Sequence, residues 1–115
     1  MTLKKIISFG FRHEGGGPNV IPGVVVIDVR KAFRNPYHDK KLRKFRGTDA
    51  AVQADIRKTP AFTAKYDHLK EAVSAPGVEV AYIGCTGGHH RSVYLAELLG
   101  KELGVEVEHR DYDKP

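Results

Sequence analysis

Nine consecutive residues, Gly84 to Ser92, combine glycines with side chains that bind anions: they read Gly-Cys-Thr-Gly-Gly-His-His-Arg-Ser, between an apolar β-branched run and a helical pattern. A strand that passes into a helix here leaves backbone N–H groups without intrahelical partners, and such groups attract anions. Gly87 and Gly88 let the backbone approach a phosphate closely. The side chains that add hydrogen-bond donors are Thr86, His90, Arg91 and Ser92. The pattern predicts a phosphate site; the alternative is a tight turn that needs its glycines for geometry alone.

The same loop has the spacing of an enzymatic phosphate loop, a cysteine followed after five residues by Arg-Ser. In cysteine-dependent phosphatases a thiolate attacks phosphorus while the arginine binds the transferring phosphoryl oxygens. Cys85 and Arg91 would take these roles here. Gly84 stands where those enzymes usually carry histidine, and a lone cysteine at a strand end is commonly a buried, inert thiol. The sequence favours anion binding and keeps the phosphatase as the alternative.

Other polar residues follow predicted strands and could reach the same ligand. If the strands are parallel, the loop lies at the carboxyl edge of the sheet, where α/β proteins bind ligands. Asp28 could accept hydrogen bonds from a sugar hydroxyl or an amine. His38, His90 and His109 could donate to a phosphate. The alternatives are that Asp28 orients Arg91 and that the histidines are ordinary surface residues.

Residues 31–46 form a basic segment with interleaved aromatic rings. Cations mixed with flat rings suit RNA, because lysine and arginine hold phosphates while rings stack on unpaired bases. The predicted RNA-binding cations are Lys40, Lys41, Arg43, Lys44 and Arg46. A solvated basic loop with its aromatic residues packed beneath it is the alternative.

The elements that would position these residues alternate between strand and helix. Runs rich in β-branched residues predict strands at residues 4–9, 24–29, 78–83 and 105–109. Helical patterns predict helices at residues 50–58, 60–74 and 92–103, with Thr59 as an N-cap and Gly104 as a C-cap. Residues 30–47 have no clean period and should form a loop. We expect one α/β domain over residues 1–115, with flanking helices on a small, mostly parallel sheet of about four strands.

Length, charge and cysteine content limit what the chain can be. Its 115 residues can bury one modest core. Residues 1–60 carry 13 Lys/Arg against 5 Asp/Glu and the rest carry 6 against 9, which allows a polyanionic partner without requiring one. No apolar run approaches the roughly 20 residues of a membrane span, and the lone Cys85 cannot form an internal disulfide. We expect a cytoplasmic protein that binds no membrane, no metal and no cofactor.

Several spaced motifs together resemble the C-terminal domain of the RapZ, or YvcJ-type, RNase adapter family. They run through nearly the whole chain in the family's order, and the ten residues around Cys85 are the most specific of them. The matching pieces are Ser8-Phe9-Gly10-Phe11, Asp28-Val29-Arg30, Asn35-Pro36-Tyr37, Leu42-Arg43, residues 47–49, residues 84–93, Ala96-Glu97 and His109-Arg110-Asp111.

The resemblance implies a domain similar to a subdomain of 6-phosphofructokinase that binds an amino-sugar phosphate and contributes to small-RNA binding and RNase recruitment. It implies ligand sensing rather than catalysis. The residues that would inherit the anion and sugar contacts are Asp28, Thr86, Gly87, Gly88 and Arg91, with His38 or Tyr37 at a pocket position after Asn-Pro. The sequence holds no Walker-type lysine loop, which the family carries in its N-terminal half, so nucleotide hydrolysis is not expected.

Three hypotheses result. The first is a binding module for a phosphorylated small molecule, a phosphosugar or a nucleotide, that also contacts RNA through residues 31–46 as an adapter. The second is a phosphatase that uses Cys85. The third is an adapter that forms a homo-oligomer and whose pocket has lost its ligand. Hydrolysis of a generic aryl phosphate separates the first two.

Overall fold

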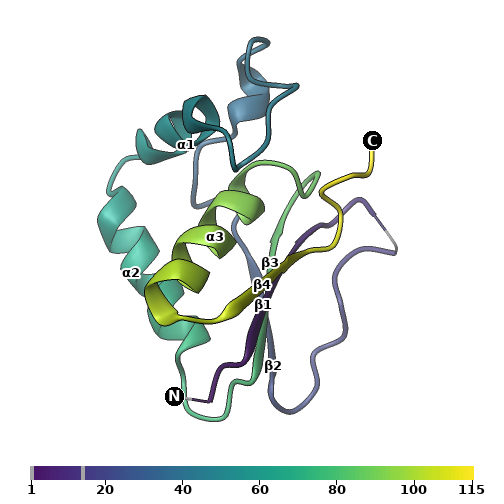
Figure 1. Ribbon diagram of the computed structural model, residues 1–115, viewed down its shortest axis with the longest axis vertical. Helices are drawn as coiled ribbons and strands as arrows, with labels where there is room; N and C mark the ends of the chain where they lie inside the picture. The colour runs from purple at the N-terminus through teal and green to yellow at the C-terminus, as the bar shows by residue number, and fades with distance from the viewer. Residues whose placement is uncertain (1, 14) are drawn as a thin grey trace.

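A computed structural model describes residues 2–13 and 15–115, and it shows strands and helices in the predicted alternation (Figure 1). The strands are β1 (Lys5–Gly10), β2 (Val24–Asp28), β3 (Val80–Cys85) and β4 (Glu106–His109). The helices are α1 (Ala50–Arg57), α2 (Phe62–Val73) and α3 (Arg91–Leu103), with a short 3-10 helix, η1, at Pro36–His38. The predicted α/β class is confirmed, and each predicted strand and helix has a counterpart.

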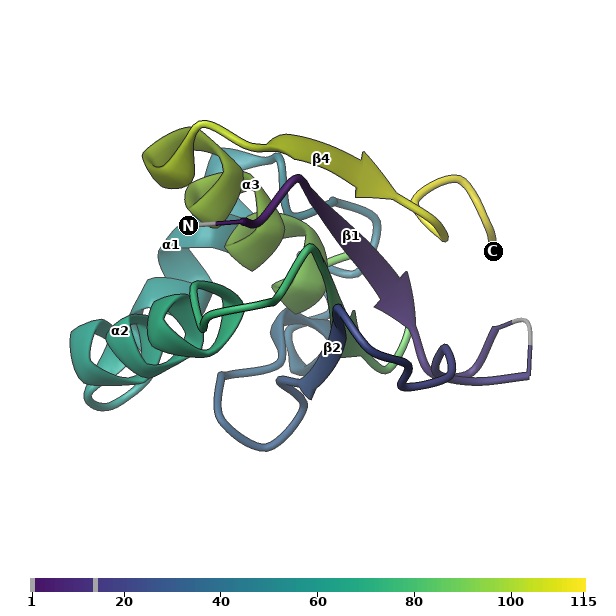
Figure 2. The same cartoon turned by 90° about the horizontal axis from the view of Figure 1, so that it is seen from below.

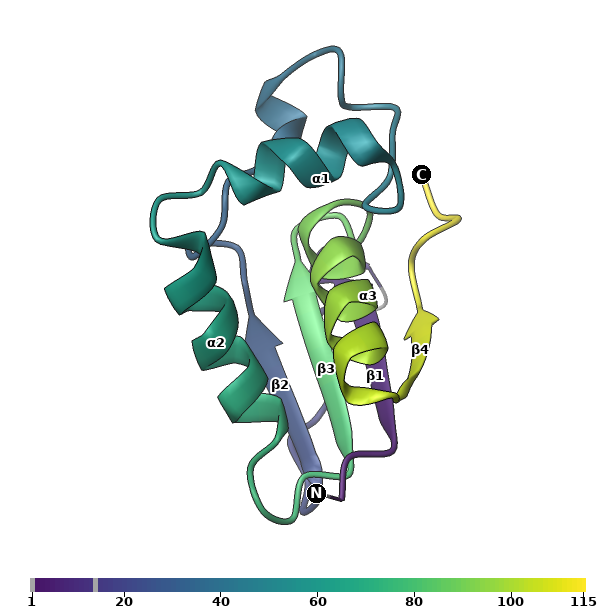
Figure 3. The ribbon, with the colours of Figure 1, turned by 60° about the vertical axis from the view of Figure 1, so that its left-hand side comes forward.

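The four strands are parallel and lie in the order β2-β3-β1-β4. Strand β1 pairs with β3 up to Gly10 opposite Cys85, and with β4 up to Ser8 opposite His109. All four carboxyl ends therefore meet at one edge of the sheet. Figure 3 shows that α1 crosses this edge, whereas α2 and α3 run along the strands. The likeness to a phosphofructokinase subdomain stays a prediction.

The core lies between the sheet and its helices. Ile6 of β1 and Ile83 of β3 are fully buried against α3, which contributes the equally buried Leu95 and Leu99. Burying a side chain of this size stabilises a fold by about 1.5 to 3 kcal/mol. Residues 11–13 and 15–23, between β1 and β2, lie on the side of the sheet away from the helices (Figures 1 and 2).

Helix α3 carries the end of the 84–92 loop and is fixed at its other end by glycines. Gly104 has a φ of 67° and its N–H donates to the carbonyl of Gly100, as the predicted C-cap requires. At Gly100 the helix passes so near β4 that a Cβ would overlap the side chain of Val107. This close approach fixes α3, and with it the loop, against the sheet.

The predicted cap of the second helix is wrong. Helix α2 begins at Phe62 after Ala61, a residue with a φ of 57° that makes no side-chain cap. Thr59 instead donates to the carbonyl of Ile56 at 2.6 Å and accepts from the N–H of Arg34 at 2.9 Å. The Thr59 hydroxyl therefore closes the end of α1 and holds Arg34, in the segment that precedes α1. It is not available to cap α2.

Candidate functional site

A cavity of about 190 Å³ lies at the carboxyl edge of the sheet. The 84–92 loop supplies six lining residues, Cys85, Thr86, Gly87, His89, His90 and Arg91. The others are Arg12, which follows β1, and Asn35, Tyr37 and Arg43 from the segment between β2 and α1. Three guanidinium groups and no Asp or Glu line this cavity among the described residues. Its wall is therefore positively charged.

The loop closes tightly over the end of β1. Gly88 has a φ of 76°, and a Cβ at this position would lie 2.7 Å from the backbone nitrogen of Gly10. Only glycine fits such an approach without strain. The side chain of His90 precedes α3 and makes no cap hydrogen bond. Within the described residues, no backbone N–H from 87 to 92 donates a hydrogen bond, which leaves a row of donors at the start of a helix.

Arg91 is the most unusual residue of the site because its charge is buried and no described acidic residue pairs with it. The residue is only 4% exposed. Its Nη1 donates to the carbonyl of Arg30 at 2.6 Å, but its buried Nε has no hydrogen-bond partner among the described residues. Burial lowers the pKa of Arg91, while Cys85 and Asp28 oppose that shift. A buried guanidinium in this state is costly unless an anion joins it.

Two histidines on the cavity wall are oriented by backbone carbonyls. His89 donates from Nε2 to the carbonyl of Lys114 at 2.6 Å, and His90 donates from Nε2 to the carbonyl of Phe45 at 2.8 Å. Burial, together with nearby Arg46, lowers the pKa of both rings. Both imidazoles are therefore neutral at pH 7, with Nδ1 as the nitrogen left for a ligand.

Cys85 lies at the end of β3 with its sulfur 3.1 Å from the hydroxyl oxygen of Ser92. Both residues are buried, Cys85 at 2% exposure and Ser92 at 0%. The thiol reaches the cavity wall, as Arg91 does, but Ser92 does not line the cavity. The phosphatase spacing thus brings a thiol and a guanidinium to one cavity.

Several residues predicted to bind the ligand lie outside the cavity lining. The carboxylate of Asp28 forms an ion pair with Arg30 at 2.7 Å, and this hydrogen bonding lowers the pKa of Asp28. His38 is exposed on η1. Gly88 packs on the end of β1 and Ser92 on Cys85. Ligand contact by these four residues stays a prediction, since it would require Asp28 and His38 at least to turn toward the cavity.

Sequence reasoning missed four lining residues, Arg12, Asn35, His89 and, as a cavity residue, Arg43. Arg12 stands two residues after the end of β1, so a parallel sheet places it at the same edge as Cys85. Asn35 and Arg43 come from a segment without a period, and only the folded chain brings them there. Arg43 is held by a 2.7 Å hydrogen bond to the carbonyl of Tyr37, with its guanidinium carbon 4.5 Å from the centre of that ring.

The basic segment, residues 31–46, is largely exposed. Tyr37 and Phe45 are 52% and 44% exposed, whereas Phe33 is buried at 5%. Arg46 donates to the carbonyl of Tyr112 at 3.1 Å and lies over that ring. Within the part of the chain that the structure describes, the ammonium groups of the exposed residues Lys40, Lys41 and Lys44 form no ion pair. Two rings and three cations are therefore open to solvent.

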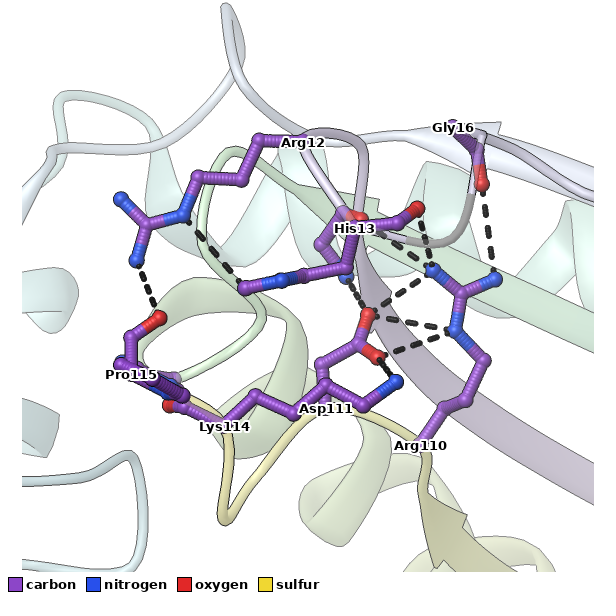
Figure 4. Close-up of polar contacts among 9 residues, drawn as sticks. Arg12, His13, Gly16, Arg110, Asp111, Lys114 and Pro115 are labelled. Carbon is purple, nitrogen blue, oxygen red and sulfur yellow. Dashed lines mark hydrogen bonds and ion pairs between the residues drawn. The ribbon is translucent and has the colours of Figure 1, made fainter.

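A buried ion-pair cluster fixes the chain after β4 (Figure 4). Asp111 is fully buried, and its carboxylate accepts from the N–H of Gly10 at 2.7 Å. The same carboxylate pairs with Arg110 at 2.9 Å and Lys114 at 2.7 Å. Burial alone would raise the pKa of Asp111, but these partners lower it to about 2. The ionised carboxylate ties the end of β1 to the C-terminal residues.

His109, also considered as a phosphate donor, has both ring nitrogens engaged. Its Nδ1 lies 2.6 Å from the hydroxyl oxygen of Ser8, and its Nε2 lies 2.6 Å from a carboxylate oxygen of Glu97. The ring therefore links β1, β4 and α3. Among residues 2–13 and 15–115, no three His, Cys, Asp or Glu side chains gather as metal ligands would. Over the same residues, no helix has the length and apolar character needed to cross a membrane.

The sequence of this chain is similar to those of a known family of proteins. Residues 2–113 match the family model described as the RapZ C-terminal domain. The chain is 39% identical over 122 residues to the nucleotide-binding protein jk1004 of Corynebacterium jeikeium, with 93% of the chain and 40% of the relative covered. It is 40% identical to a nucleotide-binding protein of Pseudothermotoga lettingae, with 96% of the chain and 42% of the relative covered. The chain thus spans about two fifths of these relatives.

Proposed function

The chain belongs to the RapZ C-terminal domain family, and from this membership and the cavity we propose that it binds a phosphorylated small molecule at the 84–92 loop. The ligand is a phosphosugar or a nucleotide, with its phosphate at Arg91 and the free N–H groups of the loop. The names of the relatives, nucleotide-binding proteins, support a small-molecule ligand of this chemical kind. The domain then acts as a sensor rather than as an enzyme.

The observation that carries this proposal is the buried Nε of Arg91, which has no partner among the described residues. A guanidinium presents its donors as a planar fork that matches two phosphate oxygens. A bound phosphate would satisfy Nε and compensate a charge that burial otherwise penalises. The neutral histidines of the cavity wall fit the rest of such a ligand, since Nδ1 of each can accept a hydrogen bond from a sugar hydroxyl.

Calorimetric titration with a panel of phosphorylated sugars and nucleotides tests the proposal. Replacing Arg91 by Gln removes a charge-assisted contact worth about 1.5 to 3 kcal/mol, so affinity should fall roughly tenfold or more. The control is Arg57→Gln, which removes an exposed arginine that lines a different surface groove, between α2 and α3. Equal affinities for the parent protein and Arg91→Gln would refute the assignment.

Phosphatase chemistry is the alternative, because Cys85 and Arg91 line the same cavity and Ser92 contacts the thiol. The sulfur is buried and Gly84 stands where these enzymes usually carry histidine, so we expect ligand binding without phosphoryl transfer. The parent and Cys85→Ser proteins should both leave an aryl phosphate intact and should bind phosphosugar with the same affinity. Turnover by the parent that Cys85→Ser abolishes would establish the enzyme instead.

RNA contact through residues 31–46 is the second part of the proposal. It is supported by the exposed ring of Tyr37, the exposed ring of Phe45 and three lysines that are open to solvent. Cations that hold phosphates beside rings that stack on bases form the usual surface for single-stranded RNA. The proposed setting is the reducing cytoplasm, which suits a protein whose one cysteine is a free, buried thiol.

Self-association is the third part of the proposal and does not depend on whether the cavity holds a ligand. Val20 and Ile21 are 75% and 58% exposed directly before β2, which is an edge strand without charge from Val24 to Ile27. Exposed apolar side chains beside an open strand edge favour pairing with another chain. Light scattering should give the mass of a dimer or larger assembly, which a Val20→Lys/Ile21→Lys variant reduces. A parent protein that is monomeric at every concentration would contradict this part.

A further inference from the structure

Arg12 lies directly against the glycine at the centre of the 84–92 loop. A Cβ on Gly87 would be 3.6 Å from Nη2 of Arg12 and 3.7 Å from its guanidinium carbon. The guanidinium therefore lies within van der Waals range of position 87, beside the loop backbone. Arg12 and Arg91 both line the cavity, yet they reach it from different elements, the end of β1 and the start of α3.

Part of the Arg12 guanidinium is also left for a ligand. Its Nη2 donates to the backbone oxygen of Pro115 at 2.9 Å, and its Nε lies 3.4 Å from a ring nitrogen of His13 (Figure 4). Among the described residues, no Asp or Glu side chain pairs with Arg12, and its Nη1 donates no hydrogen bond. The buried carboxylate of Asp111 pairs instead with Arg110 and Lys114. The guanidinium is thus held in place with donors left for an anion.

The last residues of the chain hold this arrangement in place. Residues 112–115, which we call the C-terminal segment, present three backbone oxygens to side chains around the cavity. Arg46 donates to the carbonyl of Tyr112 at 3.1 Å, His89 to that of Lys114 at 2.6 Å and Arg12 to the backbone oxygen of Pro115 at 2.9 Å. Two of the three donors, Arg12 and His89, line the cavity. The segment is itself anchored, since Lys114 pairs with the buried Asp111.

We propose that Arg12 is a second cation of the anion site, that it binds the phosphate together with Arg91, and that the C-terminal segment positions it. This inference rests on the proposed function. It adds a binding residue that follows β1 and a positioning role for residues that do not reach the ligand themselves. A dianionic phosphate can accept charge-assisted hydrogen bonds from both guanidiniums at once, whereas Arg91 alone would supply one set of donors.

Binding of glucosamine 6-phosphate and of inorganic phosphate, measured by calorimetry, tests the role of Arg12. Arg12→Gln should bind both probes about three- to tenfold more weakly, and Arg12→Lys should recover part of the loss. Arg12 is exposed, so the effect of Arg12→Gln should shrink between low and high salt, whereas the effect of the buried Arg91→Gln should persist. Unchanged affinity in Arg12→Gln, with a loss in Arg91→Gln, would overturn this inference and leave the proposed function standing.

A double-mutant cycle tests the positioning role. Truncation after Tyr112 removes the backbone oxygens that hold His89 and Arg12, and it should weaken phosphate binding in the parent but hardly at all in Arg12→Gln. Asp113→Glu is the matched control, because it changes an exposed side chain of the same segment and keeps both backbone oxygens and the ion pair of Lys114; its affinity should equal that of the parent. Additive losses from truncation and Arg12→Gln would show that the C-terminal segment does not act through Arg12. Absence of binding by the parent would refute both proposals.

Discussion

Replacing Arg91 by methionine should separate its role in binding from its role in stability. The change keeps an unbranched apolar stem and removes the charged guanidinium. In the unliganded protein it also removes the hydrogen bond from Nη1 to the carbonyl of Arg30. A charge-assisted hydrogen bond of this kind contributes about 1.5 to 3 kcal/mol.

The opposing effect is the relief of a buried charge. Arg91 is 4% exposed, has no acidic partner among the described residues and leaves Nε without a hydrogen bond. Replacing buried ionic groups by apolar ones of similar volume is often neutral or stabilising, by about 1 to 4 kcal/mol. The two effects largely cancel, so the free energy of unfolding of unliganded Arg91→Met should lie within about 2.5 kcal/mol of the parent value, by the difference of these ranges.

Urea denaturation with and without ligand provides the assay. A ligand at 100 times its Kd should stabilise the parent by about 2.7 kcal/mol and Arg91→Met by much less. Arg57→Gln should respond to the ligand as the parent does. A loss of more than about 3 kcal/mol in unliganded Arg91→Met would refute the reasoning, because it would identify Arg91 as a structural tie whose pairing is already satisfied.

Three further predictions concern pH, the buried ion pair and RNA. Burial lowers the pKa of His90 in the folded state, so the unfolded chain takes up a proton at this residue first as pH falls below about 6.5. The melting temperature of the unliganded protein should therefore drop below that pH, and it should drop less in His90→Asn. Asp111→Asn should lower the free energy of unfolding by about 3 kcal/mol at pH 7. In urea denaturation, the difference in free energy between the parent and this variant should narrow as pH falls from about 4 toward 2, because the parent carboxylate then becomes protonated. RNA binding in filter assays should weaken steeply as the salt concentration rises. In a Lys41→Glu/Arg43→Glu/Lys44→Glu variant, the slope of log K against log salt should be shallower by about 0.7 per lost contact. Equal slopes would mean that residues 31–46 are a solvated basic loop.

The sequence was sufficient to predict the parts of the fold that depend on local pattern. Strand β3 and helix α3 follow from a β-branched run and a 3.6-residue period, and Gly104 marks the end of the helix as expected. The carboxyl edge of the sheet followed from the parallel crossover. Thr59 shows where local reasoning fails, because its hydroxyl serves the end of the helix before it rather than the start of the next.

The cavity wall could be predicted only in part. Six lining residues lie in one continuous loop whose glycines and donors are visible in the sequence. Asn35 and Arg43 come from a segment without a period, and tertiary contacts place them. Asp28 illustrates the reverse case: its position at the end of β2 was correct, but the sequence does not show that Arg30, two residues away, takes its carboxylate.

A crystal structure of the protein grown with a phosphorylated sugar would show whether Arg91 holds the phosphate of the ligand. We expect a phosphate beside the 84–92 loop, with one oxygen within hydrogen-bond distance of Nε of Arg91, about 2.7 to 3.2 Å. Nε would then no longer be an unpartnered buried donor. A ligand bound elsewhere, or an empty cavity at saturating ligand with Nε still unpaired, would contradict the proposed function.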